Sequence, residues 1–318
     1  MTVATMRAAR FHAWGAPPVV EDVAEPVRER GRVLVEVQAS AVAHLDATVS
    51  GGDFGMRPPL PYIGGVEGAG IVLEADADGP APGTQVVLRG GGLGVLRDGT
   101  WTERVSVSTK AAMPLARPLP PGIAASFFVP ATTAYVALHD VARLAPDEEV
   151  IVVGAAGAVG SMVVQQALAA GAHVTAVARE ATGVPEGAAF IASDDADAVA
   201  RLTTERAATL LVDTIGGPAL AERSRWIRPG GRAVVIGYTA GPRTELDLPT
   251  WLLDDVALLP VNMIRREKRA RQLADGLVDL LADGALSLSV ERFALADAAH
   301  ALERLRSGRI RGRAVLHP

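Results

Sequence analysis

The residues best suited to chemistry form a turn of small side chains at 154–160, between an apolar β-branched run and an apolar helical pattern. A buried parallel strand typically shows such a continuous Val/Ile run. Gly157 would let the backbone approach a pyrophosphate, Gly160 would let the helix pack on the strand, and a helix N-terminus attracts anions. The order predicts a dinucleotide site with contacts from Ala156, Gly157, Ala158, Val159 and Gly160. The alternative is a strand–helix connection without a ligand, because Ala155 replaces the first glycine of the usual pattern.

Arg179 directly follows a second predicted strand, 173–178, and lies about 20 residues beyond the glycine turn. NAD enzymes hold an acidic residue there for the ribose 2′-hydroxyl, whereas an arginine can pair with a 2′-phosphate. The sequence therefore predicts NADPH as the cofactor. Glu180 is adjacent, so a shift of one residue at the end of this strand would favour NADH instead.

The composition is that of an ordinary globular chain, with 318 residues, 49% hydrophobic residues and a net charge of −5. This length accommodates two domains. The charge gives no general attraction to nucleic acid or to an anionic membrane. The chain has no cysteine, which excludes disulfides, cysteine-ligated zinc and thiolate nucleophiles. Because there is no apolar leader and no apolar run of bilayer length, we expect a cytoplasmic protein without a membrane span.

The first third of the sequence is predicted to be rich in β-strands, because short apolar runs alternate with Gly and Pro. The expected elements are strands at 6–11, 33–38, 70–73, 85–88 and 101–107, and a short helix at 40–49. Their spacing indicates a small barrel-like domain.

The middle of the chain alternates strands and helices, which favours a parallel sheet covered by helices. The expected strands are 150–154, 173–178, 189–192, 208–213, 232–237 and 257–263. Six strands in two halves match a doubly wound nucleotide-binding fold. The connection after the second strand is too short for a full helix, and 228–231 is predicted as a turn. Pro260 predicts either an edge strand or a strand that pairs across a dimer. The last part is expected to form helices at 265–283 and 297–307 and strands at 288–293 and 313–316.

Several motifs occur in the order found in a known family. They are the segments 6–10, 31–37, 61–70, 98–103, 132–135, 155–160, 213–217 and 228–231. With them the chain resembles the medium-chain dehydrogenase/reductase superfamily, in its zinc-independent quinone oxidoreductase-like branch. The resemblance implies an α/β protein with a Rossmann-type doubly wound parallel sheet at 121–265. It also implies a discontinuous GroES-like β-barrel domain for substrate, formed by 1–120 and 266–318.

The departures from the family's zinc enzymes concern the metal ligands. Zinc alcohol dehydrogenases carry a cysteine where this chain has Ala43, and a histidine where it has Val66, just before Glu67. A catalytic zinc needs three protein ligands and one open position. We therefore expect no metal site and a hydride transfer from NADPH that works without zinc.

The resemblance also implies contacts around the nicotinamide end of the cofactor. It places Thr133, Ile215, Gly237 and Tyr238 near the nicotinamide or its ribose. The alternatives are structural: Thr133 would cap a helix, and Tyr238 would fill a gap between domains.

The candidate proton donors are His44, Asp46 and Tyr62, in segments that the resemblance places in the catalytic domain. The alternatives are a surface histidine and an aspartate that caps the short helix. Related enoyl reductases use a tyrosine close to where this chain has Phe54, which leaves solvent as an equal source of the proton.

The leading hypothesis is an NADPH-dependent reductase of a quinone or an α,β-unsaturated carbonyl, and the second is an enoyl reductase acting on a thioester or a secondary-metabolite intermediate. A third, of another class, is a non-catalytic NADPH-binding protein with a structural or RNA-associated role.

Short-chain reductases are excluded, because no tyrosine is followed four positions later by lysine. We expect a small-molecule substrate, with no nucleic acid and no membrane as partner, and the resemblance implies a homodimer. Arg309 and Arg311 would either reach a cofactor phosphate or form a solvated charged cluster.

Overall fold

The computed structural model describes residues 4–318, which divide into two compact units. The first unit contains 4–128 together with Ser289–Pro318, and the second contains Val129–Leu288. Each unit is built around its own sheets. No helix among residues 4–318 is long and apolar enough to cross a bilayer.

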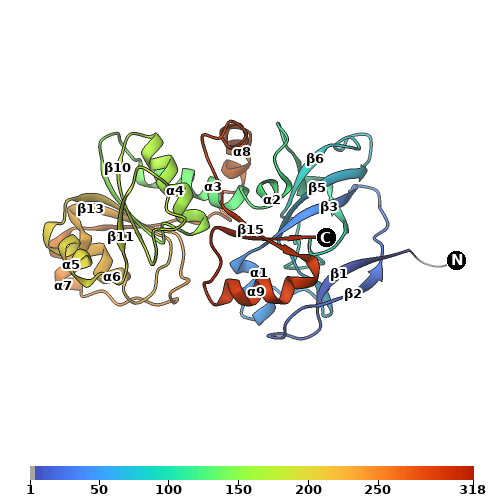
Figure 1. The fold of residues 1–318 in the computed structure, drawn as a ribbon, viewed down its shortest axis with the longest axis horizontal. Coiled ribbons are helices and arrows are strands. Elements are labelled where there is room, and N and C mark those ends of the chain that lie inside the picture. Colours follow the sequence, from blue (N-terminus) through green and yellow to red (C-terminus); the bar gives the residue numbers. More distant parts are fainter. Residues whose placement is uncertain (1–3) are drawn as a thin grey trace. The chain divides into compact units, whose positions relative to one another are not determined.

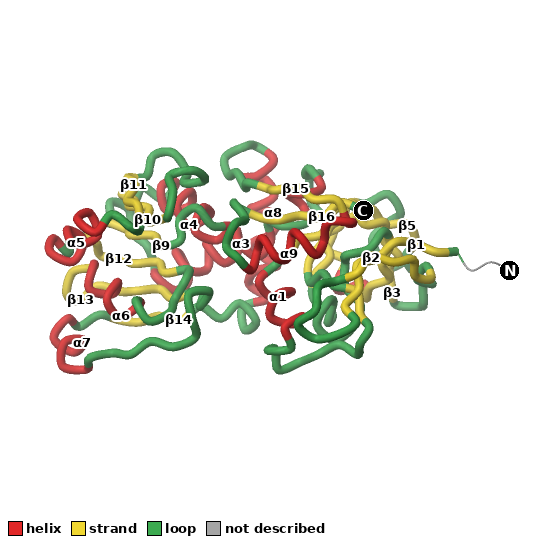
Figure 2. Tube along the Cα trace, turned by 60° about the horizontal axis from the view of Figure 1, so that its bottom comes forward, coloured by secondary structure: helices red, strands yellow, loops and turns green. Residues whose placement is uncertain are grey.

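The second unit is organised around a sheet whose neighbouring strands all run parallel (Figure 1). Within 129–288 the strand order is β11-β10-β9-β12-β13-β14. The bounds are β9 Glu149–Val153, β10 His173–Ala178, β11 Ala189–Ala192, β12 Ala208–Asp213, β13 Ile227–Val235 and β14 Ala257–Pro260. The order runs outward in one direction from β9 and in the other from β12, which confirms the doubly wound Rossmann-type sheet. Figure 2 shows these strands side by side.

The helices of the second unit connect these strands, as the periodicity predicts. Their bounds are α3 Phe128–Tyr135, a π-helical turn Val136–Ala142, α4 Ala158–Ala169, α5 Ala196–Glu205, α6 Leu220–Arg223, a 3-10 turn Ser224–Trp226, α7 Leu248–Asp254 and α8 Glu267–Ala282. The connection between β10 and β11 contains no helix in the described chain, and β14 is an edge strand that ends at Pro260. Both predictions are confirmed.

Two expected boundaries of this sheet are wrong. Strand β13 begins at Ile227 rather than 232, but residues 228–231 pair with neither β12 nor β14 in the described chain, and Gly230 has a φ of 74°, so the turn predicted there is present as a bulge within the strand. The register between β12 and β13 shifts at this point, since Ala208 pairs with Ile227 and Leu210 pairs with Arg232. The last strand ends at Pro260 instead of 263.

The first unit contains two sheets within its described residues. One has the order β2-β1-β4, and the other has the order β15-β16-β3-β5-β6-β8 with β7 paired to β3. The strands are β1 Thr5–Phe11, β2 Val19–Ala24, β3 Arg32–Val42, β4 Tyr62–Ile63, β5 Glu67–Glu74, β6 Gln85–Arg89, β7 Arg104–Ser108, β8 Ala112–Pro114, β15 Val290–Ala294 and β16 Arg313–His317. The helical segments are α1 His44–Gly51, a 3-10 turn Thr109–Ala111, α2 Pro121–Ala124, a 3-10 turn Leu295–Asp297 and α9 Ala298–Arg306.

The C-terminal strands complete the sheet of the N-terminal segment. Strand β16 pairs antiparallel with the end of β3, with Ala314 opposite Val42 and Leu316 opposite Ser40. In Figure 1 the red C-terminal strands accordingly lie beside the blue β3. This pairing extends β3 through residues 40–42, so the helix expected at 40–49 begins only at His44. The family's discontinuous GroES-like domain is thus present.

Helix α8 clusters with the second unit, although the sequence places it with the first domain by resemblance. Arg269 on α8 pairs with Asp140 through two contacts of 3.0 and 3.2 Å, and its guanidinium lies over the Tyr135 ring. These contacts tie α8 to α3 and to the π-helical turn.

Candidate functional site

The glycine turn joins the end of β9 to the start of α4. Gly157 is the N-cap residue of α4, is exposed, and provides no side-chain cap for the first helical turn. Ala156, Ala158 and Val159 are partly exposed. The N–H groups at the start of an α-helix have no partner inside the helix, and the helix dipole favours an anion there. The turn can therefore receive a phosphate group.

The two glycines of this turn differ in what surrounds them. A Cβ on residue 160 would lie 2.1 Å from the Gly154 carbonyl oxygen, whereas a Cβ on residue 157 would meet only that oxygen, at 3.2 Å. Gly160 is therefore required for close packing of α4 on the strand end. Gly157 leaves the outer side of the turn open to a ligand.

Arg179 lies on the same edge of the sheet. The Val177 carbonyl accepts hydrogen bonds from Gly154 N at 3.0 Å and Ala155 N at 3.3 Å. Arg179 follows two residues later, directly after β10, and is exposed. Glu180 is exposed as well. The backbone of Arg179 thus starts beside the glycine turn, where a nucleotide ribose would lie in this fold.

A buried ion pair shapes the loop that follows β12. Asp213 is fully buried, and its Oδ2 accepts from Arg223 Nε at 2.7 Å. Its Oδ1 accepts from the backbone N–H groups of Ile215 at 2.9 Å and Gly216 at 2.8 Å. Arg223 also donates to the Gly216 carbonyl at 2.6 Å. This network holds Ile215 half-buried at the strand end, against the apolar core of the unit.

Gly237 and Tyr238 follow β13 at the same edge. A Cβ on residue 237 would lie 2.4 Å from the Thr214 carbonyl oxygen, so a glycine there allows the two loops to approach each other. The side chain of Tyr238 is 68% exposed. The residues that follow β9, β10, β12 and β13 therefore gather at the carboxyl ends of neighbouring parallel strands. In open α/β sheets, ligands bind in that crevice, where the strand order reverses.

Thr133 belongs to α3 rather than to one of these loops. It is 2% exposed, and within the described part of the chain its Oγ1 has no hydrogen-bond partner. Burying an unpaired hydroxyl costs roughly 1–3 kcal/mol. The alternative of a helix cap therefore has no hydrogen bond to support it, and a ligand that satisfied this hydroxyl would remove the penalty.

The three candidate proton donors lie in the first unit, and Asp46 has a structural task there. Its Oδ2 accepts from Ala43 N at 2.8 Å, which caps the start of α1. Its Oδ1 accepts from Gly65 N at 3.1 Å and Val66 N at 3.0 Å. Asp46 is 3% exposed. The carboxylate therefore fastens α1 to the turn between β4 and β5, which agrees with the capping alternative.

The surroundings move the pKa values of Asp46 and His44 in opposite directions. Burial raises the pKa of Asp46 to about 7 against the lowering effect of its N–H donors, and the nearby Glu67 carboxylate adds to the rise. His44 keeps an exposed surface, yet partial desolvation and the nearby Arg313 charge lower the pKa of its imidazole. Neutral imidazole is therefore the dominant form of His44 at pH 7.

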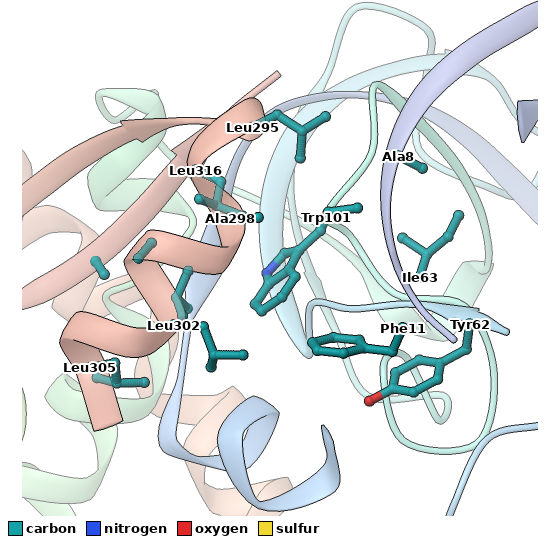
Figure 3. Close-up of a cluster of buried hydrophobic side chains, with 14 of the residues drawn as sticks. Ala8, Phe11, Tyr62, Ile63, Trp101, Leu295, Ala298, Leu302, Leu305 and Leu316 are labelled. Atoms are coloured by element: carbon teal, nitrogen blue, oxygen red, sulfur yellow. The ribbon is translucent and has the colours of Figure 1, made fainter. Parts of the chain in front are cut away.

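Tyr62 belongs to an apolar cluster in the first unit (Figure 3). Its ring stacks on Phe11 at a centroid distance of 5.1 Å and lies 5.8 Å from Trp14, and the residue is 2% exposed. Figure 3 shows it beside Phe11 and Ile63, with Trp101 between Phe11 and the leucines of α9. Burial raises the pKa of the Tyr62 phenol. Tyr62 therefore contributes to the apolar core of the first unit.

Sequence reasoning missed a buried charge cluster next to Asp46. Glu67 is 3% exposed, its Oε1 pairs with Arg89 at 2.7 Å, and its Oε2 pairs with Arg313 at 2.7 Å. Both oxygens of the acidic residue at the family's zinc-ligand motif thus face guanidinium groups. Among residues 4–318, no group of three or more His, Asp or Glu side chains is placed to hold a metal ion. Arg313 is 246 positions from Glu67, so no local pattern could have indicated the pair.

Comparisons with known proteins agree with this architecture. Residues 29–117 match the family described as alcohol dehydrogenase GroES-like domain, and residues 187–316 match the one described as zinc-binding dehydrogenase. Quinone oxidoreductase-like protein 2 of Rattus norvegicus is 27% identical over 253 residues, which cover 76% of this chain and 71% of that protein. The crystal structure of a Pseudomonas syringae pv. Tomato DC3000 quinone oxidoreductase has a TM-score of 0.84 at 25% identity, covering 98% of this chain and 100% of the other.

The chain belongs to the medium-chain dehydrogenase/reductase superfamily, in its quinone oxidoreductase-like branch.

A further relative is much longer than the chain. A phenolphthiocerol/phthiocerol polyketide synthase polypeptide of Mycobacterium tuberculosis is 29% identical over 309 residues, which cover 91% of this chain and 14% of that protein.

As a member of the medium-chain superfamily, the present chain is an oxidoreductase that acts on a small molecule with a nicotinamide cofactor.

Proposed function

We propose that this protein transfers hydride from NADPH to a quinone or an α,β-unsaturated carbonyl without zinc. The observation that carries the proposal is the group of loops at the carboxyl ends of β9, β10, β12 and β13. This group combines an open glycine turn at a helix N-terminus with Arg179 at the end of the adjacent strand. When bound, NADPH supplies the hydride, and the protein supplies orientation and polar contacts.

The residues of the second unit fit the cofactor in distinct ways. The first turn of α4, through Gly157, Ala158 and Val159, would hold the pyrophosphate. Arg179 would pair with the 2′-phosphate. The buried pair of Asp213 and Arg223 fixes the loop that presents Ile215, while Thr133, Gly237 and Tyr238 would surround the nicotinamide end.

The zinc-independent chemistry is proposed from the residues at the family's metal positions. Ala43 and Val66 have no ligand atoms in their side chains, and both oxygens of Glu67 are engaged by arginines. Zinc would polarise a carbonyl oxygen as a Lewis acid. Without it, hydride addition suits a conjugated acceptor, in which the developing charge spreads onto oxygen and can be stabilised by hydrogen bonds.

For the proton step, we retain His44 as the candidate side chain because it is the exposed member of the three predicted donors. Asp46 and Tyr62 become positioning residues, one through its backbone contacts and the other through packing. Since neutral imidazole predominates at pH 7, solvent serves equally well as the final source of the proton.

A second candidate function is reduction of an enoyl thioester or a secondary-metabolite intermediate. The similarity to a polyketide synthase favours it, since polyketide assembly handles carrier-bound acyl groups. Both candidates share the hydride step and differ in the acceptor.

We also propose that the protein works as a homodimer in the cytoplasm. The edge strand β14 could pair with its copy in a second chain, and Leu252 and Leu253 on the preceding helix α7 are 69% and 84% exposed.

The proposal is tested by titrating the purified protein with NADPH and with NADH. Arg179→Ala removes the proposed 2′-phosphate contact, and Arg201→Ala removes an exposed arginine of α5 as a matched control. We expect Arg179→Ala to weaken NADPH binding by one to two decades (roughly 1.5–3 kcal/mol) and to leave NADH binding and the control unchanged. Equal affinities in the wild type would place Glu180 at the ribose instead. Failure to bind either nucleotide would overturn the proposal.

A further inference from the structure

The first unit has a hollow of about 420 Å³, and half of its lining residues are arginines. It lies where β15 begins and where the loop between α9 and β16 passes. Its lining residues are Ser289, Val290, Glu291, Arg304, Arg309 and Arg311. Cavities of this size are typical of small-molecule sites.

The hollow is a positively charged area on a chain whose net charge is −5. The segment 289–313 contains six arginines and three carboxylates. The lining has three guanidinium groups and one carboxylate, Glu291, and Glu303 pairs with Arg309 from beside the hollow, so the guanidinium groups still outnumber the carboxylates. This excess of positive charge favours an anionic ligand.

Two of the guanidinium groups contact neighbouring residues. Arg304 Nη2 lies 2.6 Å from Glu291 Oε1 and donates to the Arg309 carbonyl at 3.1 Å, and its guanidinium packs over the Phe293 ring. Arg309 pairs with Glu303 and donates to Ser307 Oγ at 2.8 Å. Arg304 is therefore positioned before a ligand arrives, which reduces the entropy lost on binding, whereas the Arg309 side chain is 59% exposed and stays adaptable.

We propose that this hollow binds a phosphate-bearing ligand. Guanidinium groups donate paired hydrogen bonds that match the oxygens of phosphate, and several of them together suit a diphosphate better than a single carboxylate. The six lining residues all belong to the first unit, whereas the residues proposed for the cofactor belong to the second. The phosphate would come either from free anion or from the phosphate tail of an acyl thioester substrate.

Direct binding tests the site without any need for turnover. Inorganic pyrophosphate is titrated calorimetrically into the full chain, as wild type and as Arg309→Gln/Arg311→Gln, in the presence of excess NADPH, which would occupy the pyrophosphate site proposed at α4. The matched control is Arg30→Gln/Arg57→Gln, which removes the same charge from exposed positions elsewhere in the first unit. We expect the first double variant to bind pyrophosphate at least tenfold more weakly and the control to bind as the wild type does. Absence of binding to the wild type, or an equal loss in the control, would overturn the proposal.

A second set of measurements distinguishes the two sources, and this part rests on the proposed function. The KM for crotonyl-coenzyme A is compared with that for a phosphate-free enone. A tenfold rise in KM for the thioester alone, in Arg309→Gln/Arg311→Gln, supports a substrate tail. Unchanged KM values together with lost pyrophosphate binding support a free anion.

A titration with NADPH tests whether the hollow is separate from the cofactor site. The double variant should bind NADPH as tightly as the wild type does. If it weakens NADPH and spares NADH, the arginines serve the cofactor, and the separate site is contradicted. If no variant turns over any acceptor, the proposed function fails, while the pyrophosphate titration still decides the site.

Discussion

Gly160 and Gly154 are so close that a Cβ atom on residue 160 would lie 2.1 Å from the carbonyl oxygen of Gly154. Helix α4 therefore starts directly against the end of the central strand β9. Its first N–H groups are held at the position where the strand order of the sheet reverses. The geometry of this turn depends on residue 160 being glycine, while residue 157 has room at its outer side.

We expect Gly160→Ala to destabilise the protein by about 2–3 kcal/mol, since the added methyl meets backbone that cannot move without shifting β9 or α4. Gly157→Ala is the matched variant, because its nearest contact is 3.2 Å away and its φ of −77° suits alanine. It should fold normally and weaken NADPH binding. Urea unfolding and nucleotide titration check both. Equal stability losses in the two variants would contradict the distinct roles.

Removal of the Asp46 carboxylate is expected to loosen α1. Asp46→Ala leaves three N–H groups without their acceptor and should lower the free energy of unfolding by roughly 2–4 kcal/mol. Asp46→Asn keeps an oxygen for Gly65 and Val66 and should cost less. Urea unfolding and kcat are measured on both variants. A large loss of kcat in a fully stable Asp46→Asn protein would instead identify Asp46 as a proton donor.

Breaking the buried pair of Asp213 and Arg223 should be severe. Arg223→Met leaves the fully buried Asp213 without its cation, and a broken buried pair typically costs about 3–5 kcal/mol. Adding Asp213→Asn removes the stranded charge, so the double variant should recover part of the stability. Unfolding of the wild type, both single variants and the double variant measures the coupling. Additive losses would show that the pair is not coupled.

The ion pair between Glu148 and Arg232 predicts a loss of stability in acid. The two hydrogen bonds from Arg232 hold the pKa of Glu148 at about 2, against a usual value of 4.5. A carboxylate with a depressed pKa stabilises the folded state above its unfolded pKa, and this contribution disappears as the pH falls from about 4.5 to about 2. Between these limits, the wild type should lose about 2–3 kcal/mol more than Glu148→Gln. Parallel unfolding curves over this pH range would contradict the assignment.

Most of the fold could be predicted because its strands and connections are marked by residues next to one another in the sequence. The continuous Val/Ile run of β9, the short connection after β10 and Pro260 in β14 each gave an expectation that the structure confirms. The errors arise from contacts distant in sequence. Residues 40–42 belong to β3 because β16 pairs with them, and α8 groups with the second unit, where Arg269 pairs with Asp140.

Part of the candidate site could also be predicted from local spacing, and part of it could not. Spacing alone identified Gly160 and placed Arg179 at the end of a strand beside the glycine turn. No pattern marked Arg223 as the partner of Asp213, or Arg313 as the partner of Glu67, because an arginine's partner depends on tertiary packing. The family resemblance proposed Asp46 as a proton donor, but a sequence cannot tell a carboxylate that faces substrate from one that accepts three backbone N–H groups.

The most direct test of zinc-independent hydride transfer is NADPH oxidation by benzoquinone and by an α,β-unsaturated ketone, before and after dialysis against EDTA. We predict that NADPH is consumed with at least one of these acceptors and that the rate is the same after EDTA treatment. The account is contradicted if neither acceptor is reduced, or if EDTA abolishes the activity and added zinc restores it.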